Sequence, residues 1–462
     1  QLKPKIQKYN SHLIKINQEL VNRVNSISNL INQQKNSLTT KRYEIDENYK
    51  KIQDLKKREG QLKMDQIGKD AKQIKGLPKF PKLSNIKWSP DQTKIAMTNT
   101  TKEGVELWYI DLERVTAKKL IGPKLNASLG DVITWYQDSK NILTKLKLKN
   151  PPEVIDAEDL VPTGPIISSN DGKKAQNRTY QDLLKNEVDE KNFETLARSV
   201  LSKVSLKGKT KLLAKKNLYH EIDFSPDGKF ILISIIQKPF SYLVPYYRFP
   251  MKYAIYSSKG KELTVLHEVP LIEDLPKGFM AVRTGPRNFS WRSDRPSDLI
   301  FVEALDGGNP EKDIKYRDEI FEIGYPFKQN KVSLLKTINR FYRIDWCNDT
   351  LALGYDYWWN SRNTKTYIFS PSNTNKEPKI IIDRNYQDRY NDPGSFVKRR
   401  NFYGKSILAM NKQNLYLMGD GFRDDGQFPF IDQLNLESLK KVRLYESSFK
   451  DKKEDLLDFE AD

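Results

Sequence analysis

The sequence contains very little cysteine and histidine. Its 462 residues include one cysteine, Cys347, and three histidines, His12, His220 and His267. One cysteine cannot form a disulfide within the chain or supply a multi-cysteine metal site, and no two histidines have the spacing of a zinc site. We therefore expect no metal ion and no cofactor, and we interpret Cys347 as a thiol packed inside the fold.

A recognisable catalytic nucleophile is also missing from the sequence. No serine stands in a Gly-x-Ser-x-Gly turn, and Asp306-Gly-Gly-Asn309 lacks the Lys-Ser/Thr and the helix of a phosphate loop. His220 and His267 fall in expected strands, where a packed side chain is a better interpretation than a catalytic base. We therefore assign no catalytic residue and expect this chain to be inactive as an enzyme by itself.

Long apolar runs are absent, so we expect no membrane span. No signal peptide is visible, but the chain begins with Gln1 rather than Met, so the missing leader says little about the compartment. Net charge is +19, which would suit nucleic acid, an anionic membrane or acidic substrates. Lys is spread along the whole chain without an RNA-binding signature, so we favour background composition and expect no nucleic-acid partner.

What the sequence does contain is a repeated strand–turn–strand unit. Its clearest copy is Asp223-Phe-Ser-Pro-Asp-Gly-Lys-Phe-Ile-Leu-Ile-Ser234. Pro226, Asp227 and Gly228 are the residues that a tight turn favours. The run from Phe230 to Ile236 is almost entirely apolar, which is typical of a strand buried on both faces.

Four further copies carry an aromatic residue and an Asp at like positions, and a faded copy begins at Gly404 and precedes Leu415-Tyr-Leu-Met. The aromatic residues of the five clear copies are Trp88, Trp135, Phe224, Trp291 and Trp346. They recur every roughly 45 to 90 residues, at or beyond the spacing of four-stranded propeller blades. The sequence therefore predicts an all-β fold, a β-propeller with six recognisable blades centred, at the C-terminal end, on Trp291, Trp346 and Ile407. Residues 455–460 resemble the start of a further blade that the chain end cuts off.

The chain divides into two regions of different periodicity. Residues 1–60 have a heptad-like apolar pattern, from Leu20 to Ile52, which predicts an N-terminal α-helical, coiled-coil-like extension. It would be a partner-binding helix, a solvated extension or a segment foreign to the domain that follows. Residues 61–462 form the expected propeller domain, interrupted at about 151–201 by a long insertion with a loop-like first half and short helices in 181–196.

Two stretches look more like a binding site than like blade core. One is Phe240-Ser-Tyr-Leu-Val-Pro-Tyr-Tyr-Arg-Phe249, and the other is Gly278-Phe-Met-Ala-Val-Arg-Thr-Gly-Pro-Arg287. Their arginines either bind a carboxylate in two-point geometry, or bond backbone carbonyls and blade carboxylates such as Asp294. The candidate binding residues are Tyr246, Tyr247, Arg248, Arg283 and Arg287.

Several longer blocks resemble a known family. The sequence from about residue 61 onward is similar to the N-terminal propeller of bacterial prolyl-oligopeptidase-family serine peptidases, in the glutamyl endopeptidase branch. The blocks are Pro162-Thr-Gly-Pro-Ile, Gly172-Lys-Lys-Ala-Gln-Asn-Arg-Thr-Tyr-Gln-Asp-Leu-Leu-Lys, Pro239-Phe-Ser-Tyr-Leu-Val-Pro-Tyr-Tyr-Arg-Phe-Pro, Pro270-Leu-Ile-Glu-Asp-Leu-Pro-Lys-Gly-Phe-Met-Ala-Val-Arg-Thr-Gly, Val302-Glu-Ala-Leu-Asp-Gly-Gly, Tyr355-Asp-Tyr-Trp-Trp-Asn-Ser-Arg and Gly426-Gln-Phe-Pro-Phe.

The resemblance implies a seven-bladed propeller capping a C-terminal α/β-hydrolase domain that cleaves peptides after glutamate with a Ser-Asp-His triad. It also implies an exported enzyme, periplasmic or secreted. No triad residue can be carried over, because the hydrolase domain should follow Asp462 and residues 1–60 replace the family's Pro-rich start. We therefore expect a fragment, or the product of a broken or misjoined gene.

Two functions remain open at this point. In the first, the chain is the substrate-gating part of a serine endopeptidase, and its partners are a peptide substrate and the missing hydrolase domain. Arg248, Arg283 or Arg287 would then hold an acidic substrate side chain beside Tyr246 and Tyr247. In the second, the chain is a non-catalytic β-propeller that serves as a protein-binding platform.

Overall fold

The structure is a computed structural model that describes Arg23, Ser26 and residues 72–156, 180–328, 330–449, 452–457 and 459. The chain separates into two units, Gln1–Gln73 and Ile74–Asp462. The helix predicted for residues 1–60 therefore lies almost entirely outside the described residues. The same is true of most of the loop-like first half of the 151–201 insertion.

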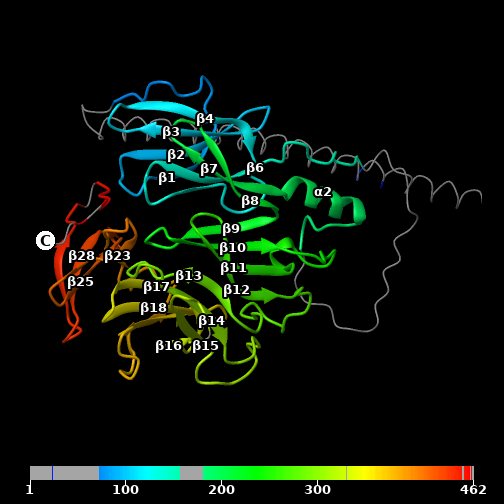
Figure 1. Ribbon diagram of the computed structural model, residues 1–462. Coiled ribbons are helices and arrows are strands. Elements are labelled where there is room, and N and C mark those ends of the chain that lie inside the picture. The colour runs from blue at the N-terminus through cyan, green and yellow to red at the C-terminus, as the bar shows by residue number, and fades with distance from the viewer. Residues whose placement is uncertain are drawn as a thin grey trace, which may run out of the picture. The chain divides into compact units, whose positions relative to one another are not determined.

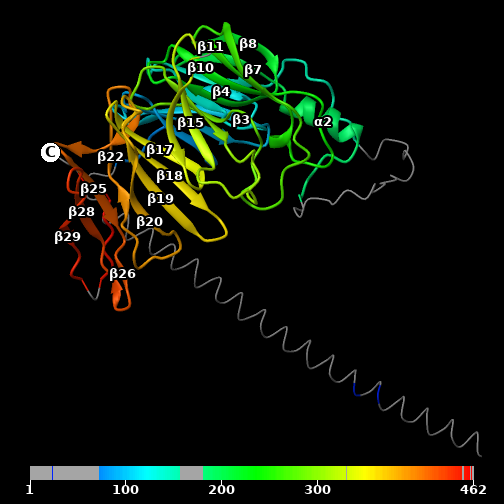
Figure 2. The same ribbon diagram turned by 90° about the horizontal axis from the view of Figure 1, so that it is seen from below.

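The described part of the second unit contains six blade-like groups of antiparallel strands that follow one another along the chain (Figures 1 and 2). The first two groups are joined into one eight-stranded sheet by the pairing of Leu125 with Leu146. Blade 1 consists of β1 (Leu83–Trp88), β2 (Lys94–Thr100), β3 (Val105–Asp111) and β4 (Thr116–Leu125). Blade 2 consists of β5 (Ile133–Trp135), β6 (Asn141–Leu146), β7 (Ser199–Ser205) and β8 (Thr210–Asn217). Blade 3 consists of β9 (Tyr219–Phe224), β10 (Phe230–Ile236), β11 (Met251–Ser257) and β12 (Glu262–Val269). Blades 4 and 5 are β13 (Arg287–Trp291), β14 (Leu299–Ala304), β15 (Asp318–Ile323) and β16 (Val332–Thr337); and β17 (Arg340–Asn348), β18 (Leu351–Trp358), β19 (Asn363–Phe369) and β20 (Lys379–Asn385). Blade 6 is β21 (Ser395–Phe396), β24 (Met410–Asn411), β25 (Asn414–Gly419), β28 (Phe430–Asn435) and β29 (Lys441–Glu446), with two added hairpins, β22 (Lys398–Arg400) with β23 (Ser406–Leu408) and β26 (Phe422–Arg423) with β27 (Gly426–Gln427).

The five aromatic residues of the repeat occupy equivalent places in blades 1 to 5. Each lies at or near the end of the first strand and pairs with the first or second residue of the next strand, as Phe224 does with Ile231. In the turn between them, the Ser225 hydroxyl donates to Asp227 at 2.7 Å and accepts from the amide of Phe230 at 3.0 Å. The predicted all-β, propeller-like fold is thus confirmed for the described residues.

The blades pack on one another through their apolar faces. The run in β10 is almost completely buried, and Ile231 and Ile233 belong to the same core cluster as Leu143 and Leu201 of blade 2. The five aromatic residues of the repeat, which we call the anchors, also form hydrogen bonds between blades. The Trp135 indole, for example, donates to the carbonyl of Lys87 at 2.8 Å. The buried apolar residues form a series of separate clusters, several of which join neighbouring blades.

Blade 6 departs from the repeat. Its first strand is split into β21 and β24, and the β22–β23 hairpin is inserted between them. The expectation that the sixth blade centres on Ile407 was therefore wrong, because Ile407 lies in the inserted hairpin. The strand that follows, β25, was predicted correctly. The turn-like Gly404 misled the prediction, since hairpin tips and blade turns favour the same residues.

A seventh blade is not confirmed. None of the described residues near the C-terminus, 452–457 and 459, lies in a strand, and Phe459 packs on Tyr416 of blade 6 with 5.0 Å between ring centroids. At the other end of the series, Trp88 is 48% exposed, whereas Trp291 is 7% exposed. Among the described residues, the aromatic residue of blade 1 is thus covered much less than that of blade 4.

The strand connections gather at two ends of the blades. We call the end with loops 237–250, 270–286, 305–317 and 359–362 the loop face, where the amide of Val282 donates to the Gly308 carbonyl at 3.1 Å. We call the end with turns 89–93, 136–140, 225–229 and 292–298 the turn face, where the amide of Asp227 donates to the Pro296 carbonyl at 3.0 Å. No helix within the described ranges is both long and apolar enough to cross a membrane.

Candidate binding face and its arginines

Helix α2 (Glu187–Ala197) and the loop after β10 support each other on the loop face (Figure 1). The Asn186 side chain caps the helix by accepting from the amides of Val188 and Asp189, a capping arrangement that satisfies free N–H groups. Phe193 of the helix then packs edge-on against Phe240, with 5.2 Å between ring centroids. The second half of the insertion was predicted to be helical, and α2 confirms this.

The packed loop carries three of the predicted site residues on a single 3₁₀ turn, η2 (Tyr246–Arg248). Tyr246 and Tyr247 are 39% and 57% exposed, and Tyr246 stands edge-on to His220 at 5.9 Å. Arg248 is instead buried, with its guanidinium 5.2 Å from the ring centre of Tyr180. The two tyrosines therefore face solvent, whereas Arg248 points into the fold.

Arg283 is half-buried in the connection between blades 3 and 4. Its guanidinium donates to the carbonyl of Thr284 at 3.0 Å and to that of Pro286. Burial lowers the pKa of Arg283, and the charge of Arg287 adds to this effect while Tyr253 opposes it. These carbonyl bonds correspond to the structural alternative for the arginines that the sequence left open.

Arg287 begins β13 and belongs to a buried network of charges. It forms an ion pair with Asp318 at 2.5 Å, and Asp318 also accepts from Arg340 at 3.0 Å. Arg340 in turn donates to Asp306 at 2.6 Å, and Arg317 to the same carboxylate at 3.1 Å. Three guanidinium groups thus share two carboxylates that water hardly reaches, which ties the starts of β13 and β17 to the loop face.

Two exposed aromatic residues of the loop face escaped the sequence analysis. Phe279 and Trp359 are 69% and 42% exposed, and their ring centroids lie 5.7 Å apart. The Arg362 guanidinium lies 3.8 Å from the centre of the Trp359 ring. Both aromatic residues lie in sequence blocks that were already noted. The sequence did contain a signal for them, because Phe279 follows Gly278, a turn residue, and Trp359 follows another aromatic residue, and neither fits an alternating strand pattern.

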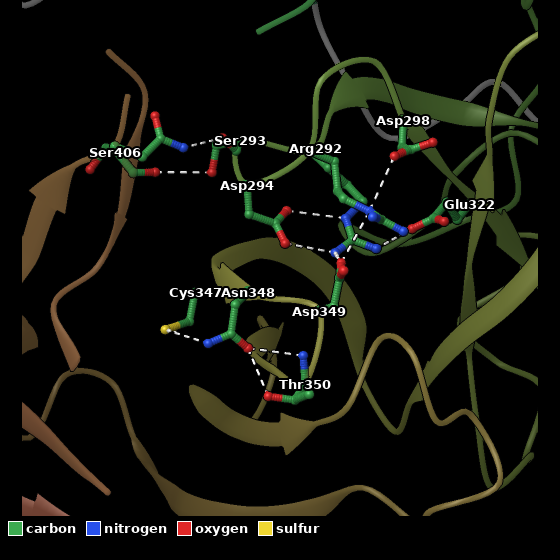
Figure 3. Close-up of polar contacts among 12 residues, drawn as sticks. Arg292, Ser293, Asp294, Asp298, Glu322, Cys347, Asn348, Asp349, Thr350 and Ser406 are labelled. Atoms are coloured by element: carbon green, nitrogen blue, oxygen red, sulfur yellow. Dashed lines mark hydrogen bonds and ion pairs between the residues drawn. The ribbon is translucent and has the colours of Figure 1, made fainter. Parts of the chain in front are cut away.

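Another buried arginine, Arg292, organises the turn face (Figure 3). Its guanidinium donates to both carboxylate oxygens of Asp294, at 3.1 and 2.7 Å, and also to Glu322. It further lies 3.4 Å from Asp349 and stacks 4.3 Å from the ring centre of Trp346. The bidentate ion pair offsets the free-energy cost of burying the charge, and the contacts with Asp349 and Trp346 hold the turns of blades 4 and 5 side by side.

The described residues offer little for catalysis. No group of three or more His, Cys, Asp or Glu side chains within the described ranges could hold a metal ion. Burial lowers the pKa of His220 and of His267, so both favour the neutral form at pH 7. The Ser234 hydroxyl lies 3.5 Å from His220 Nδ1, but Ser234 is buried within the sheet and cannot reach a substrate.

Comparison with known proteins points to a peptidase relative. No protein-family model matches the chain. The chain is 33% identical over 395 residues to a protein of Oryza sativa subsp. japonica named "Probable glutamyl endopeptidase, chloroplastic", and 33% identical over 406 residues to one of the same name from Arabidopsis thaliana. These alignments cover 81% and 84% of this chain but 42% of each relative. The chain is thus homologous to less than half the length of proteins named glutamyl endopeptidase.

Solved structures with a similar fold are more distant. A prolyl endopeptidase shares 11% identity at a TM-score of 0.42, covering 79% of this chain and 42% of that chain. The β-propeller domain of the trilobed protease from Pyrococcus furiosus shares 10% sequence identity at a TM-score of 0.38, and the match covers 76% of this chain and 83% of that one. An oligogalacturonate lyase shares 12% sequence identity at a TM-score of 0.42, and the match covers 77% of this chain and 75% of that one. These neighbours include both peptidases and a lyase, and at such low similarity they say nothing about activity.

Proposed function

We propose that this chain is the substrate-gating propeller portion of a prolyl-oligopeptidase-family serine endopeptidase that cleaves after glutamate. The observation that carries the proposal is the 33% identity to proteins named glutamyl endopeptidase over more than four-fifths of this chain. Peptide substrate would be the ligand of the complete enzyme. On the resemblance alone we also propose an exported protein, whereas the two plant relatives are named as chloroplastic.

The catalytic partner in this proposal is an α/β-hydrolase domain that docks on the loop face. Tyr246 with Tyr247, and Phe279 with Trp359, form two exposed aromatic pairs on loops of different blades. Exposed aromatic groups of this kind mark interaction surfaces, since tyrosine and tryptophan supply large contact area with few rotatable bonds. The turn face also carries exposed aromatic groups, Phe402 beside Tyr403 and Tyr325 beside Phe230, but there the β22–β23 hairpin already lies against the turns of the other blades.

The arginines are proposed to contribute to recognition of the substrate glutamate to different degrees. Arg287 and Arg248 are buried, and Arg287 is already paired with Asp318. Arg283 is the most accessible of the three and uses its donors on backbone carbonyls, which could be exchanged for a carboxylate. A charge-assisted hydrogen bond contributes about 1.5–3 kcal/mol, so its loss should lower kcat/KM about ten- to a hundredfold.

The test uses the full-length protein that contains this sequence. Peptides with Glu or Gln before the scissile bond are compared, with and without a serine-directed inhibitor. We expect inhibitor-sensitive cleavage with a preference for Glu, and a smaller preference in Arg283→Met. Absence of inhibitor-sensitive hydrolysis would contradict the peptidase proposal and favour the binding-platform alternative, whereas an unchanged Glu preference in Arg248→Met, Arg283→Met and Arg287→Met would make all three arginines structural.

A further inference from the structure

The β22–β23 hairpin leaves blade 6 and returns to it within one interrupted strand. Before the hairpin, Phe396 pairs with Leu417 of β25, and after it Met410 pairs with Leu415 of the same strand. At the base, the amide of Ala409 donates to the carbonyl of Val397 at 2.9 Å. Residues 398–408 are therefore an excursion from a strand whose two halves stay in register.

The tip of the hairpin contacts the turn face of blades 2, 3 and 4. The Gln137 side chain of blade 2 donates to the Tyr403 carbonyl at 2.9 Å. Lys405 lies 3.9 Å from Asp223 at the end of β9 in blade 3. In blade 4, the hydroxyl of Ser293 donates to the Ser406 carbonyl at 3.0 Å, as Figure 3 shows.

The hairpin also contacts blades 1 and 5. Gly404 has φ +71°, and a side chain there would bring its Cβ to 3.3 Å from the Pro90 carbonyl oxygen in blade 1. On blade 5, Lys398 donates to Asp345 at 2.6 Å, and the Cys347 thiol lies 3.9 Å from the Leu408 carbonyl. One short hairpin thus touches all five other blades at the same end. It can do so only by lying across the axis around which the blades are arranged.

The contacts of the tip differ in kind from those that hold the blades together. They are hydrogen bonds, among them one from Asn401 to the Ser293 carbonyl at 2.8 Å, and one long ion pair, while the apolar Phe402 of the tip is 84% exposed. The buried apolar side chains of the hairpin, Ile407 and Leu408, lie in β23 next to its base. Segments with few buried apolar contacts open locally at a small fraction of the global free energy of unfolding. The tip can therefore separate from the turns while the apolar faces between blades stay packed.

We propose that the β22–β23 hairpin is a hinged cover that closes the axis at the turn face, and that it opens by releasing its tip contacts about a hinge at Val397 and Ala409. The closed state determines what can pass along the axis from this side. This inference stands on contacts within the chain and does not depend on the proposed peptidase function.

The single cysteine of the chain provides a built-in probe of the cover. Cys347 is 7% exposed, and its thiol lies against β23 of the hairpin. Burial also raises the pKa of this thiol to about 11, so it reacts slowly until it is uncovered. Lifting the hairpin would expose the thiol without unfolding blade 5.

The experiment measures the rate at which a small disulfide reagent labels Cys347 in this chain. The variant Gln137→Ala/Ser293→Ala removes two bonds to the tip from the blade side, and Gly404→Ala pushes the tip away from Pro90. Each lost hydrogen bond favours the open state, so we expect labelling about tenfold faster or more in the double variant. The matched control is Thr350→Ala, whose hydroxyl bonds to Asn348 close to the cysteine but not to the hairpin.

The dependence of labelling on urea separates lifting of the cover from global unfolding. A lifted hairpin uncovers the buried side chains of Ile407 and Leu408 but leaves the blades packed on one another. The labelling rate of the parent chain should therefore rise with urea with a slope well below that of global unfolding. Faster labelling in the two tip variants but not in the control, with this smaller slope, is the expected result. Labelling that follows global unfolding, or rates that are equal in all variants, would overturn the proposal.

Discussion

At the scale of single residues, the protein contains arginines that are almost wholly removed from water. Arg292 is 1% exposed and satisfies its guanidinium with Asp294 and Glu322 while covering the ring of Trp346. Charged groups are tolerated at such depth only when they are paired and hydrogen-bonded. The arginine is thus a structural link between blades 4 and 5, and its removal leaves buried carboxylates without a partner.

Replacement of Arg292 should therefore be far more costly than replacement of a neighbouring exposed arginine. Breaking a buried ion pair from one side costs about 3–5 kcal/mol, so Arg292→Met should lower the free energy of unfolding by about that amount. Arg295 also pairs with Asp349 but is 43% exposed, and Arg295→Met should cost less than about 1 kcal/mol. Urea unfolding of the two variants measures the difference, and equal losses would contradict the assignment.

A buried lysine makes stability depend on pH. Lys145 of β6 is 1% exposed, donates to the Leu129 carbonyl and lies 3.5 Å from that of Tyr219. Burial lowers the pKa of Lys145 to about 8, with Asp131 opposing the shift and Lys87 adding to it. Between pH 8 and the ordinary lysine pKa near 10.4, the unfolded chain therefore binds a proton that the folded chain does not.

This residue should contribute more to stability at high pH than at neutral pH. Because unfolding takes up a proton in that range, the contribution of Lys145 to the free energy of unfolding should rise by roughly 1–3 kcal/mol from pH 7 to pH 10. The measurement compares the parent chain with Lys145→Met in urea at both pH values, so that tyrosine ionisation cancels. A difference between the two proteins that does not change with pH would contradict the lowered pKa.

At the scale of the element, the strand–turn–strand unit depends on one glycine in its turn. Gly228 has φ +69°, and an added Cβ would lie 2.8 Å from the Cβ of Gln137 in the neighbouring blade. The turn thus needs glycine both for its left-handed backbone and for close approach of blades 2 and 3.

Replacing Gly228 with alanine should both strain the left-handed backbone of the turn and disturb the contact between blades 2 and 3. A left-handed non-glycine residue costs about 1–2 kcal/mol, and the contact with Gln137 adds to this in Gly228→Ala. The control is Gly307→Ala, because Gly307 has a similar φ of +66° but meets only the end of the flexible Lys312 side chain. Thermal unfolding should show the larger loss for Gly228→Ala, and a larger loss for the control would contradict the close approach.

At the scale of the whole molecule, the blades are not equivalent. The anchors of inner members of the series are covered on both sides, and Trp291 donates its indole N–H to the Asp223 carbonyl of the preceding blade at 3.1 Å. Trp88 of blade 1 is half-exposed and has no preceding blade to receive such a bond among the described residues. Position in the series, rather than local sequence, decides how much each anchor stabilises the fold.

The same substitution should therefore have different effects in different blades. Trp291→Ala should cost about 3–5 kcal/mol, the usual loss for a buried aromatic, whereas Trp88→Ala should cost well under half of that. Urea unfolding of the two variants measures the difference. Equal losses would mean that Trp88 contributes to stability as much as Trp291 does, which would contradict the difference in burial between the two side chains.

The local units of this protein could be predicted from the sequence alone. The turn residues and the alternation of apolar positions act over a few neighbouring residues, so the five anchors, the buried β10 run and α2 were all found in advance. The two exposed tyrosines also lie where an aromatic loop between prolines suggested a surface. These features depend on chemistry within one unit and need no knowledge of its neighbours.

Only the tertiary structure decided how the units use their charges and their ends. Whether Arg287 meets a substrate or Asp318 depends on a strand far along the chain, and the sequence could not rank its many carboxylates as partners. The β22–β23 hairpin resembles a blade turn in sequence, yet its contacts with five other blades place it across their axis. Local patterns determine which elements form, whereas long-range packing determines which groups meet, because each meeting joins residues from separate blades.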